Sequence, residues 1–260
     1  MSGIGLDYIP GLIKAYRSGY ATDDVHLGYW PVGQSLSWPD AQAAMTELHL
    51  EALEVTDGAT VVDIGCGLGG SLRRLNERQS NCHLSGINID PRQLTICQEI
   101  VAQNGNRLSW AEADATATGL PAASTDRALS VEAMFHFPSR AAFFAEAARI
   151  LRPGGRLVCS DILFELPQSA EHSAWLAVVM QGYAPWPEPA MTTEERNALA
   201  YTEGLQTLSL TDISPQTDQT WDHIVSSRAA PTDNPQAAMK ALHRAGRMRY
   251  LLHVLEKPGP

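Results

Sequence analysis

The sequence predicts an α/β protein built on a doubly wound, mostly parallel sheet. From about residue 60 to residue 163, short apolar runs alternate with amphipathic stretches, as expected for parallel strands connected by helices. Glycines directly follow the first apolar run, which is typical of the ligand-binding edge of an open α/β sheet. With 260 residues, of which 44% are hydrophobic, the chain can bury one large core.

The central part is predicted to contain five strands separated by helices. The runs expected to form strands are Thr60–Ile64, His83–Ile89, Leu108–Ala113, Arg127–Val131 and Gly155–Ile162. The stretches expected to form helices are Leu68–Arg78, Pro91–Asn104 and Ser139–Leu151. The second helix begins at a proline, which the first helical turn accepts because the missing amide hydrogen would have no helical partner there.

Further elements are predicted on both sides of this part. Upstream helices are expected at Tyr8–Arg17 and Asp40–Val55, the second capped by Ser37 or Asp40. After the fifth strand, a proline-rich break at 185–189 separates two expected helices, Pro167–Gly182 and Thr192–Ala200. The last part is expected to form strands at Leu205–Ile213 and Arg247–Leu255, with helices at Trp221–Ser227 and Pro235–Arg244 between them.

These elements add up to seven strands in one sheet. We expect an N-terminal helical region over residues 1–58 and a core over residues 59–260. Within the core, the two helices beside the proline-rich break are expected to form a cap, inserted after the fifth strand at about 165–203.

Charge and composition exclude several classes of protein. The formal net charge is −10 and no cluster of lysine or arginine stands out, which argues against binding to nucleic acid or to an anionic membrane surface. No run of about 18 apolar residues predicts a membrane span, and the first ten residues lack the pattern of a leader. The four cysteines, Cys66, Cys82, Cys97 and Cys159, have the spacing of neither a zinc site nor a disulfide framework. A cytoplasmic protein with reduced thiols is expected, and its oligomeric state is left open.

The glycine-rich loop after the first strand is compatible with two kinds of ligand. Gly65, Gly67 and Gly70 fit the G-x-G-x-x-G pattern of dinucleotide-binding loops. Asp63, two positions before the first glycine, would place a carboxylate beside the ligand. Because a carboxylate repels a pyrophosphate, a ligand with a cationic group is favoured over NAD.

The same loop also meets the pattern D-x-G-x-G-x-G, through Asp63, Gly65, Gly67 and Gly69. Matching segments follow in order at 86–90, 113–115 and 151–155. With these motifs the chain resembles the class I S-adenosylmethionine-dependent methyltransferases over about residues 60–163. The resemblance implies a Rossmann-like fold and S-adenosylmethionine as the cofactor.

A second resemblance concerns His26-Leu27-Gly28-Tyr29-Trp30 and Gly86-Ile87-Asn88-Ile89. These segments are similar to the small-molecule methyltransferases of sugar, sterol, tocopherol and natural-product tailoring, and the nearest group is the rebeccamycin-type sugar O-methyltransferases. In those families the first segment belongs to a lid over the cofactor. The resemblance therefore implies that the N-terminal region is a lid.

The resemblance also implies which residues hold the cofactor. Gly65 and Gly67 would line its methionine part, with Asp63 at the amino group, and Asp114 would accept a hydrogen bond from the adenine amino group. Asn88 stands where many members have an acid for the ribose hydroxyls, so Asn88, Asp90 and Gln93 remain alternatives for that contact. Asp90 is equally explained as the N-cap of the following helix. The full expected set is Asp63, Gly65, Cys66, Gly67, Asn88, Gln93, Asp114 and Ala115.

The expected chemistry is methyl transfer to a hydroxyl. His136, after the fourth strand, matches a histidine of the rebeccamycin-type enzymes, and an imidazole suits removal of the hydroxyl proton. Asp161, at the end of the fifth strand, matches an acid of their active site and is expected to orient His136. Glu132 is a weaker candidate. In-line attack on carbon requires no metal, and Asp161 with Glu132 is too small a ligand set to predict one.

The acceptor is expected to be a small, moderately apolar, natural-product-like molecule. Aromatic and thioether side chains in the predicted cap suggest a dry pocket, and Arg196 is the only fixed cation of the cap, which disfavours a polyphosphorylated substrate. The expected pocket residues are Tyr29, Trp30, Phe135, Trp175, Met180, Tyr183 and Trp186. The alternatives are methyl transfer to nitrogen or carbon, and a cofactor-binding protein that transfers no methyl group, such as a cyclase-like catalyst.

Overall fold

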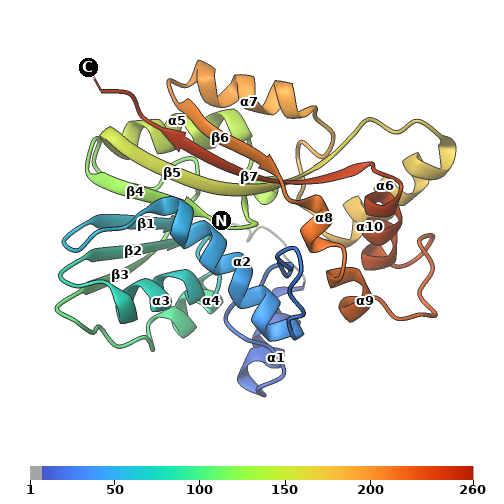
Figure 1. The fold of residues 1–260 in the computed structure, drawn as a ribbon, viewed down its shortest axis with the longest axis horizontal. Helices are drawn as coiled ribbons and strands as arrows, with labels where there is room; N and C mark the ends of the chain where they lie inside the picture. Colours follow the sequence, from blue (N-terminus) through green and yellow to red (C-terminus); the bar gives the residue numbers. More distant parts are fainter. Residues whose placement is uncertain (1–7, 260) are drawn as a thin grey trace.

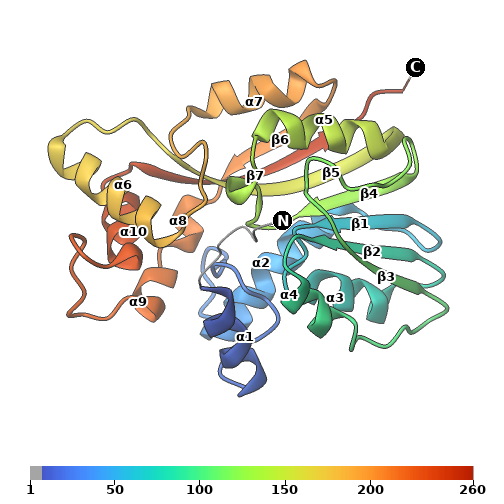
Figure 2. The same ribbon diagram turned by 180° about the vertical axis from the view of Figure 1, so that it is seen from behind.

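A computed structural model describes residues 8–259 and shows a seven-stranded sheet with helices on both faces (Figures 1 and 2). The strand order is β3-β2-β1-β4-β5-β7-β6. β7 is antiparallel to both of its neighbours, and the other pairs are parallel. The strands are β1 (Thr60–Ile64), β2 (His83–Asn88), β3 (Arg107–Glu112), β4 (Thr125–Ser130), β5 (Leu151–Phe164), β6 (Gln206–Asp212) and β7 (Met248–Glu256). The predicted fold class is confirmed.

The helices lie close to the expected positions. They are α1 (Ile9–Arg17), α2 (Trp38–Leu53), α3 (Gly70–Arg78), α4 (Pro91–Cys97), α5 (Arg140–Ile150), α6 (Ala170–Gly182), α7 (Thr193–Thr202), α8 (Ser214–Thr217), α9 (Thr220–Ile224) and α10 (Pro235–Arg244), with a 3₁₀ turn, η1, at Met134–His136. Short polar residues begin several of them. Ser37 caps α2 by accepting from the Asp40 amide, which decides between the two predicted caps, and Thr192 begins α7 with a complete capping box.

The central strands are buried on both faces, because neighbouring residues of each strand belong to different apolar clusters. On one face, Val61 packs in a cluster with residues of α2 and α3. On the other face, Val62 and Ile64 pack in a cluster with Phe143 and Phe144 of α5. These positions alternate as the strand geometry requires, and the continuous apolar runs of the sequence follow from the two-sided burial.

The predicted helix Pro91–Asn104 is too long, since α4 ends at Cys97. The chain beyond it is held against α3 by amide side chains. Asn76 donates to the Val101 carbonyl and accepts from the Gln103 amide, so these backbone groups have partners outside a helix. Asn104 then adopts a positive φ of 52°, a conformation that ends helices.

The predicted cap does not form one unit. α6 packs against α10 at one end of the sheet, whereas α7 packs against α5 and β6 on a face of the sheet (Figures 1 and 2). Arg196 of α7 is fully buried and pairs with Asp161 of β5. α7 is therefore part of the core layers. Residues 1–7 of the predicted N-terminal region lie outside the described residues.

Within residues 8–259, no helix has the length and apolar character needed to cross a membrane. The same residues contain no group of three or more histidine, cysteine, aspartate or glutamate side chains arranged to hold a metal ion. The four cysteines are free and buried.

Candidate functional site

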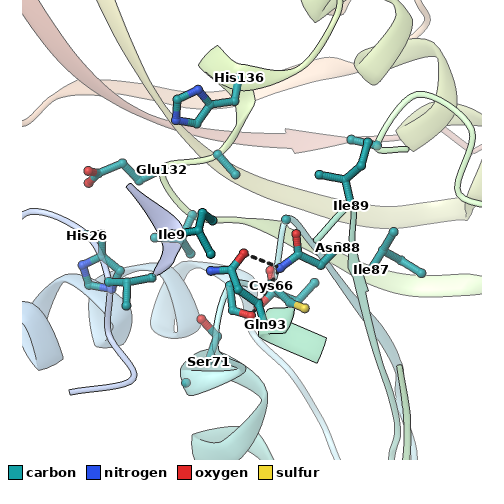
Figure 3. A pocket seen from close by; sticks show the side chains of 18 of the residues that line it. Ile9, His26, Cys66, Ser71, Ile87, Asn88, Ile89, Gln93, Glu132 and His136 are labelled. Atoms are coloured by element: carbon teal, nitrogen blue, oxygen red, sulfur yellow. Dashed lines mark hydrogen bonds between the residues drawn. The ribbon is translucent and has the colours of Figure 1, made fainter. Parts of the chain in front are cut away.

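A pocket lies at the carboxyl ends of the central strands and is closed by the N-terminal segment (Figure 3). It contains about 1060 Å³ of space, part of it open to solvent, which is at the upper end of the range for small-molecule sites. All eight residues predicted to bind the cofactor line it, together with His136 and Glu132. The carboxyl edge of the sheet brings them together because β1, β2 and β4 are parallel neighbours.

The glycine-rich loop forms one wall of the pocket. Gly65 has a φ of 82° and Gly67 a φ of 52°, values that strain any residue with a side chain. A Cβ atom at Gly65 would also lie 2.5 Å from the Cβ of Ala133. The amides of Gly65 and Cys66 both donate to the Ile87 carbonyl, which fixes the loop against the end of β2. The backbone is thus open to close approach by a ligand.

Asp63 supplies a buried carboxyl group beneath this loop. Its side chain lines the pocket, is 2% exposed, and its Oδ1 atom has no hydrogen-bond partner within the described part of the chain. Burial raises the pKa of Asp63 from 3.8 to about 7, because desolvation disfavours the charged form. Such a group is suited to a ligand that brings its own positive charge.

Asn88 and Gln93 form a pair on the opposite side of the loop. Asn88 Nδ2 donates to Gln93 Oε1 at 3.0 Å, as Figure 3 shows, and to the Gly67 carbonyl at 3.3 Å. Asp90 does not line the pocket. It accepts from the Arg92 amide as the N-cap of α4, and its ion pair with Arg92 lowers the pKa of its carboxyl group. Of the three alternatives for the ribose contact, Asn88 and Gln93 line the pocket, whereas Asp90 caps the following helix.

Asp114 and Ala115 follow β3 and line the adjoining part of the pocket. Asp114 Oδ1 accepts from the amide of Thr116 at 2.8 Å and from its hydroxyl at 2.6 Å. These two bonds fix the carboxylate in a turn, so that its orientation toward the pocket is set before a ligand binds.

His136 lies at the end of η1 and reaches the pocket from the side opposite Asn88 (Figure 3). Its Nδ1 is 2.8 Å from the Pro185 carbonyl, and its Nε2 is 3.3 Å from the Tyr8 hydroxyl. Because a carbonyl can only accept, Nδ1 carries the hydrogen and Nε2 carries the lone pair. Burial lowers the pKa of His136, which favours the neutral ring that can accept a proton.

Asp161 does not orient His136, and this prediction is wrong. Asp161 is fully buried, is not part of the pocket lining, and accepts from Arg140 Nε at 2.8 Å and Arg196 Nε at 2.9 Å. Its position at a strand end made it resemble an active-site acid, but two guanidinium groups, one from helix α5 and one from helix α7, neutralise its charge. The Pro185 carbonyl orients the imidazole instead.

Glu132, which the sequence ranked below Asp161, lies in the pocket. It follows β4 with a positive φ of 49°, a conformation that is rare outside glycine and is concentrated at functional sites. Its Oε2 atom accepts from the Leu27 amide and the Tyr250 hydroxyl, each at 2.9 Å. Burial raises the pKa of Glu132 to about 7. In the sequence, the feature that pointed to Glu132 was its place at the end of the fourth predicted strand, next to the expected cleft.

The residues predicted for the acceptor pocket lie outside the lining of this pocket, and some of them contact residues that line it. None of the seven is in the lining of this pocket. Phe135 and Trp186 stack on each other with ring centroids 4.3 Å apart, and Trp30 stacks on His223 at 5.7 Å. Phe135 and Trp186 contact the lining residue His136, with ring centroids 4.4 Å and 6.1 Å from it, and the Tyr183 ring lies 6.2 Å from that of Tyr8. The aromatic groups of the cap are thus used to attach it to the core.

The N-terminal segment provides the lining that sequence reasoning missed. Its pocket residues are Tyr8, Ile9, Leu12, Asp23, Asp24, Val25 and His26. His26 belongs to the predicted lid motif and does reach the pocket, whereas Tyr29 and Trp30 do not. The amphipathic pattern of α1 was the available signal, but its partner surface could not be read from the pattern alone.

Comparisons with known proteins give a consistent result. Residues 62–159 match a family of methyltransferase domains. Methyltransferase GfsG of Streptomyces halstedii is 36% identical over 205 residues, which cover 76% of this chain and 72% of that protein. The 27-O-demethylrifamycin SV methyltransferase of Amycolatopsis mediterranei (strain S699) is 29% identical over 203 residues, with coverage of 76% and 72%.

Among solved structures, the [4+2]-cyclase SpnF is similar over 100% of both chains, with a TM-score of 0.73 and 20% sequence identity. At this identity the similarity shows a shared fold. It does not indicate a shared reaction.

Proposed function

This chain belongs to the class I S-adenosylmethionine-dependent methyltransferases of small molecules, and on this basis we propose that it methylates a hydroxyl group of a small, moderately apolar, natural-product-like acceptor. His136 is the proposed general base. The observation that carries the proposal is the orientation of His136: the Pro185 carbonyl holds Nδ1, which leaves Nε2 as the acceptor atom in the pocket that the predicted cofactor-binding residues line.

The described residues fit S-adenosylmethionine, the cofactor of this family. Asp63, with its unpartnered Oδ1, is the proposed partner of the cofactor's ammonium group, and the strained backbone of Gly65 and Gly67 gives the close approach it needs. Asn88 and Gln93 are the proposed ribose contacts, since their paired amides still offer hydrogen-bonding capacity. Asp114, with the neighbouring Ala115, is the proposed adenine contact.

When bound, the cofactor supplies a methyl group activated by a sulfonium. The chain contributes positioning, exclusion of water and removal of a proton. The Tyr8 hydroxyl, 3.3 Å from His136 Nε2, marks where a hydroxyl can donate to the base. In the proposed reaction the acceptor hydroxyl takes this position and passes its proton to His136 Nε2. Asp161 has no part in this step.

Transfer to oxygen is proposed over the alternatives for two reasons. A hydroxyl needs a base more than a neutral amine does, and His136 is arranged as one. The name of the Amycolatopsis relative also refers to an O-demethyl substrate. Transfer to a neutral amine nitrogen, or a cyclase-like reaction as in the structural neighbour, would leave His136 without this task, whereas transfer to carbon would have the base remove a proton from carbon instead.

The proposal is tested with His136→Ala. We expect S-adenosylhomocysteine to bind the variant with wild-type affinity in calorimetry, because His136 lies away from the glycine-rich loop. We expect methyl transfer to a panel of apolar natural-product alcohols, measured as S-adenosylhomocysteine formed, to fall by about 10²- to 10⁴-fold. In the wild type, the acid limb of the kcat/KM profile should lie below pH 6.5, since burial lowers the pKa of His136 from that value.

The matched control is His83→Ala, at an exposed position at the start of β2, which should leave both measurements unchanged. A His136→Ala variant that keeps its rate would contradict the role of His136 and favour nitrogen as the acceptor atom. Tight cofactor binding with no product on any acceptor would favour the non-methylating alternative.

A further inference from the structure

Glu132 belongs to the part of the pocket that faces the acceptor. Burial, and after it the charge of Glu132, raises the pKa of both Tyr8 and Tyr183. Tyr8 is the residue in contact with His136 Nε2. In Figure 3, Glu132 and His136 lie on the same side of the pocket, beyond Ile9 and away from the Asn88–Gln93 pair. The carboxyl group is therefore near the base and away from the proposed ribose contact.

The position of Glu132 is fixed by hydrogen bonds from neutral groups. Its amide donates to Ser160 Oγ at 2.9 Å, and the Leu27 amide and Tyr250 hydroxyl both donate to Oε2. Both of these side-chain bonds are made to Oε2, and neither donor carries a charge. The strained backbone and these bonds hold the side chain toward the pocket without giving its charge a counter-ion.

The charges around the pocket make Glu132 unusual. The described lining includes carboxyl groups but no lysine or arginine. Asp23 and Asp24 are paired outside the pocket with Arg73 and Arg74, and Asp63 and Asp114 are assigned to the cofactor. The one remaining carboxyl group of the lining is Glu132.

We propose that Glu132 is a specificity-determining residue that binds a second, hydrogen-donating group of the acceptor, distinct from the hydroxyl that is methylated, with a protonated amine preferred over a hydroxyl at this position and with phosphates and carboxylates rejected. The inference rests on the proposed function, since it assumes that the acceptor binds beside His136. An ammonium would give this partly buried carboxylate the counter-ion that it lacks. An anionic head group would meet like charge with no cation to offset it.

The test compares three probes of one apolar body: geranylamine, geraniol and geranyl diphosphate. Each is titrated calorimetrically into protein saturated with S-adenosylhomocysteine, which lacks the sulfonium charge, so that the probe's charge is measured against the protein alone. We expect geranylamine to bind about tenfold more tightly than geraniol, equivalent to ~1.4 kcal/mol, and geranyl diphosphate to bind more weakly than both.

Glu132→Gln keeps an oxygen that can accept from Leu27 and Tyr250 but removes the charge. We expect it to weaken geranylamine binding about tenfold and to change geraniol binding by less than threefold. Glu171→Gln, which removes an exposed acid at the start of α6, is the matched control and should change neither. Thermal unfolding of each variant establishes that it is folded.

Three results would overturn the inference: no binding of geranylamine to the wild type, tighter binding of the diphosphate, or equal loss of amine and alcohol binding in Glu132→Gln. The comparison of probes on the wild type needs no variant, so a misfolded Glu132→Gln does not prevent the test. Failure of S-adenosylhomocysteine itself to bind would instead refute the proposed function.

Discussion

Replacing Asp63 by asparagine tests the central electrostatic feature of the pocket. Asp63 is buried and its Oδ1 has no partner in the described chain, so the ligand-free protein must either desolvate a carboxylate or protonate it. Burial raises the pKa from 3.8 to about 7. A shift of about three units corresponds to ~4 kcal/mol that ionised Asp63 costs the native state.

The sign of the pH dependence follows from this shift. Because the native-state pKa is higher than the unfolded one, the native state holds an extra proton between about pH 4 and pH 7. The contribution of Asp63 to the unfolding free energy therefore falls as the pH rises through this window and is constant above it. Asp63→Asn removes this penalty. About two of the three pH units of this window lie between pH 5 and pH 8. We therefore expect the gain in unfolding free energy of the ligand-free variant over the wild type to be ~2.6 kcal/mol larger at pH 8 than at pH 5.

The assay is urea unfolding of the ligand-free proteins at pH 5 and pH 8, with calorimetric titration of S-adenosylmethionine at pH 8. Since the variant leaves the cofactor's ammonium without a buried counter-ion, its affinity should fall by ~30-fold or more, from the ~2–5 kcal/mol typical of such pairs. Asp233→Asn, at an exposed loop position, is the control. If Asp63→Asn has the same effect on stability at both pH values, the buried carboxyl is not the unpaired group that the geometry indicates.

Two further substitutions distinguish a residue that contacts the cofactor from a residue that stabilises the fold. Gly65→Ala would place a Cβ atom 2.5 Å from that of Ala133 at a position with a positive φ of 82°. We therefore expect the unfolding free energy measured in urea to fall by ~1–3 kcal/mol and S-adenosylmethionine to bind at least tenfold more weakly in calorimetry. Unchanged affinity would show that the loop does not touch the cofactor. Asp161→Asn breaks a buried pair with Arg140 and Arg196 and should cost ~3–5 kcal/mol with cofactor affinity retained. The exposed Asp222→Asn should cost less than ~1 kcal/mol, and an equally small loss for Asp161→Asn would contradict its structural role.

Much of the fold could be predicted because its signals are local. The apolar runs around Val61 and Val62 are continuous since both faces of the sheet are covered. Asp63 and the glycines after it can be recognised from their backbone requirements and from their place at the end of a strand. Neither signal depends on residues far away in the chain. The set that lines the pocket was therefore available from motifs through their family resemblance. Helix limits failed at 98–104, where side chains such as Asn76 offered other partners, and near 214–227, where the short helix α8 was not predicted.

The assignment of catalytic and acceptor-binding roles was beyond the sequence, because it depends on partners far apart in the chain. Asp161 and Glu132 both lie at the carboxyl edge of the sheet, yet Arg196, 35 positions away from Asp161, decides that Asp161 is a core ion pair. Glu132 stays in the pocket because Leu27 and Tyr250, from opposite ends of the chain, hold it there. The sequence by itself determined the sheet, the glycine-rich loop and the cofactor class, since these rest on local backbone geometry. Tertiary structure alone decided which charges are neutralised and which are left for a ligand, since a charge is satisfied by whatever the fold brings within a few ångströms.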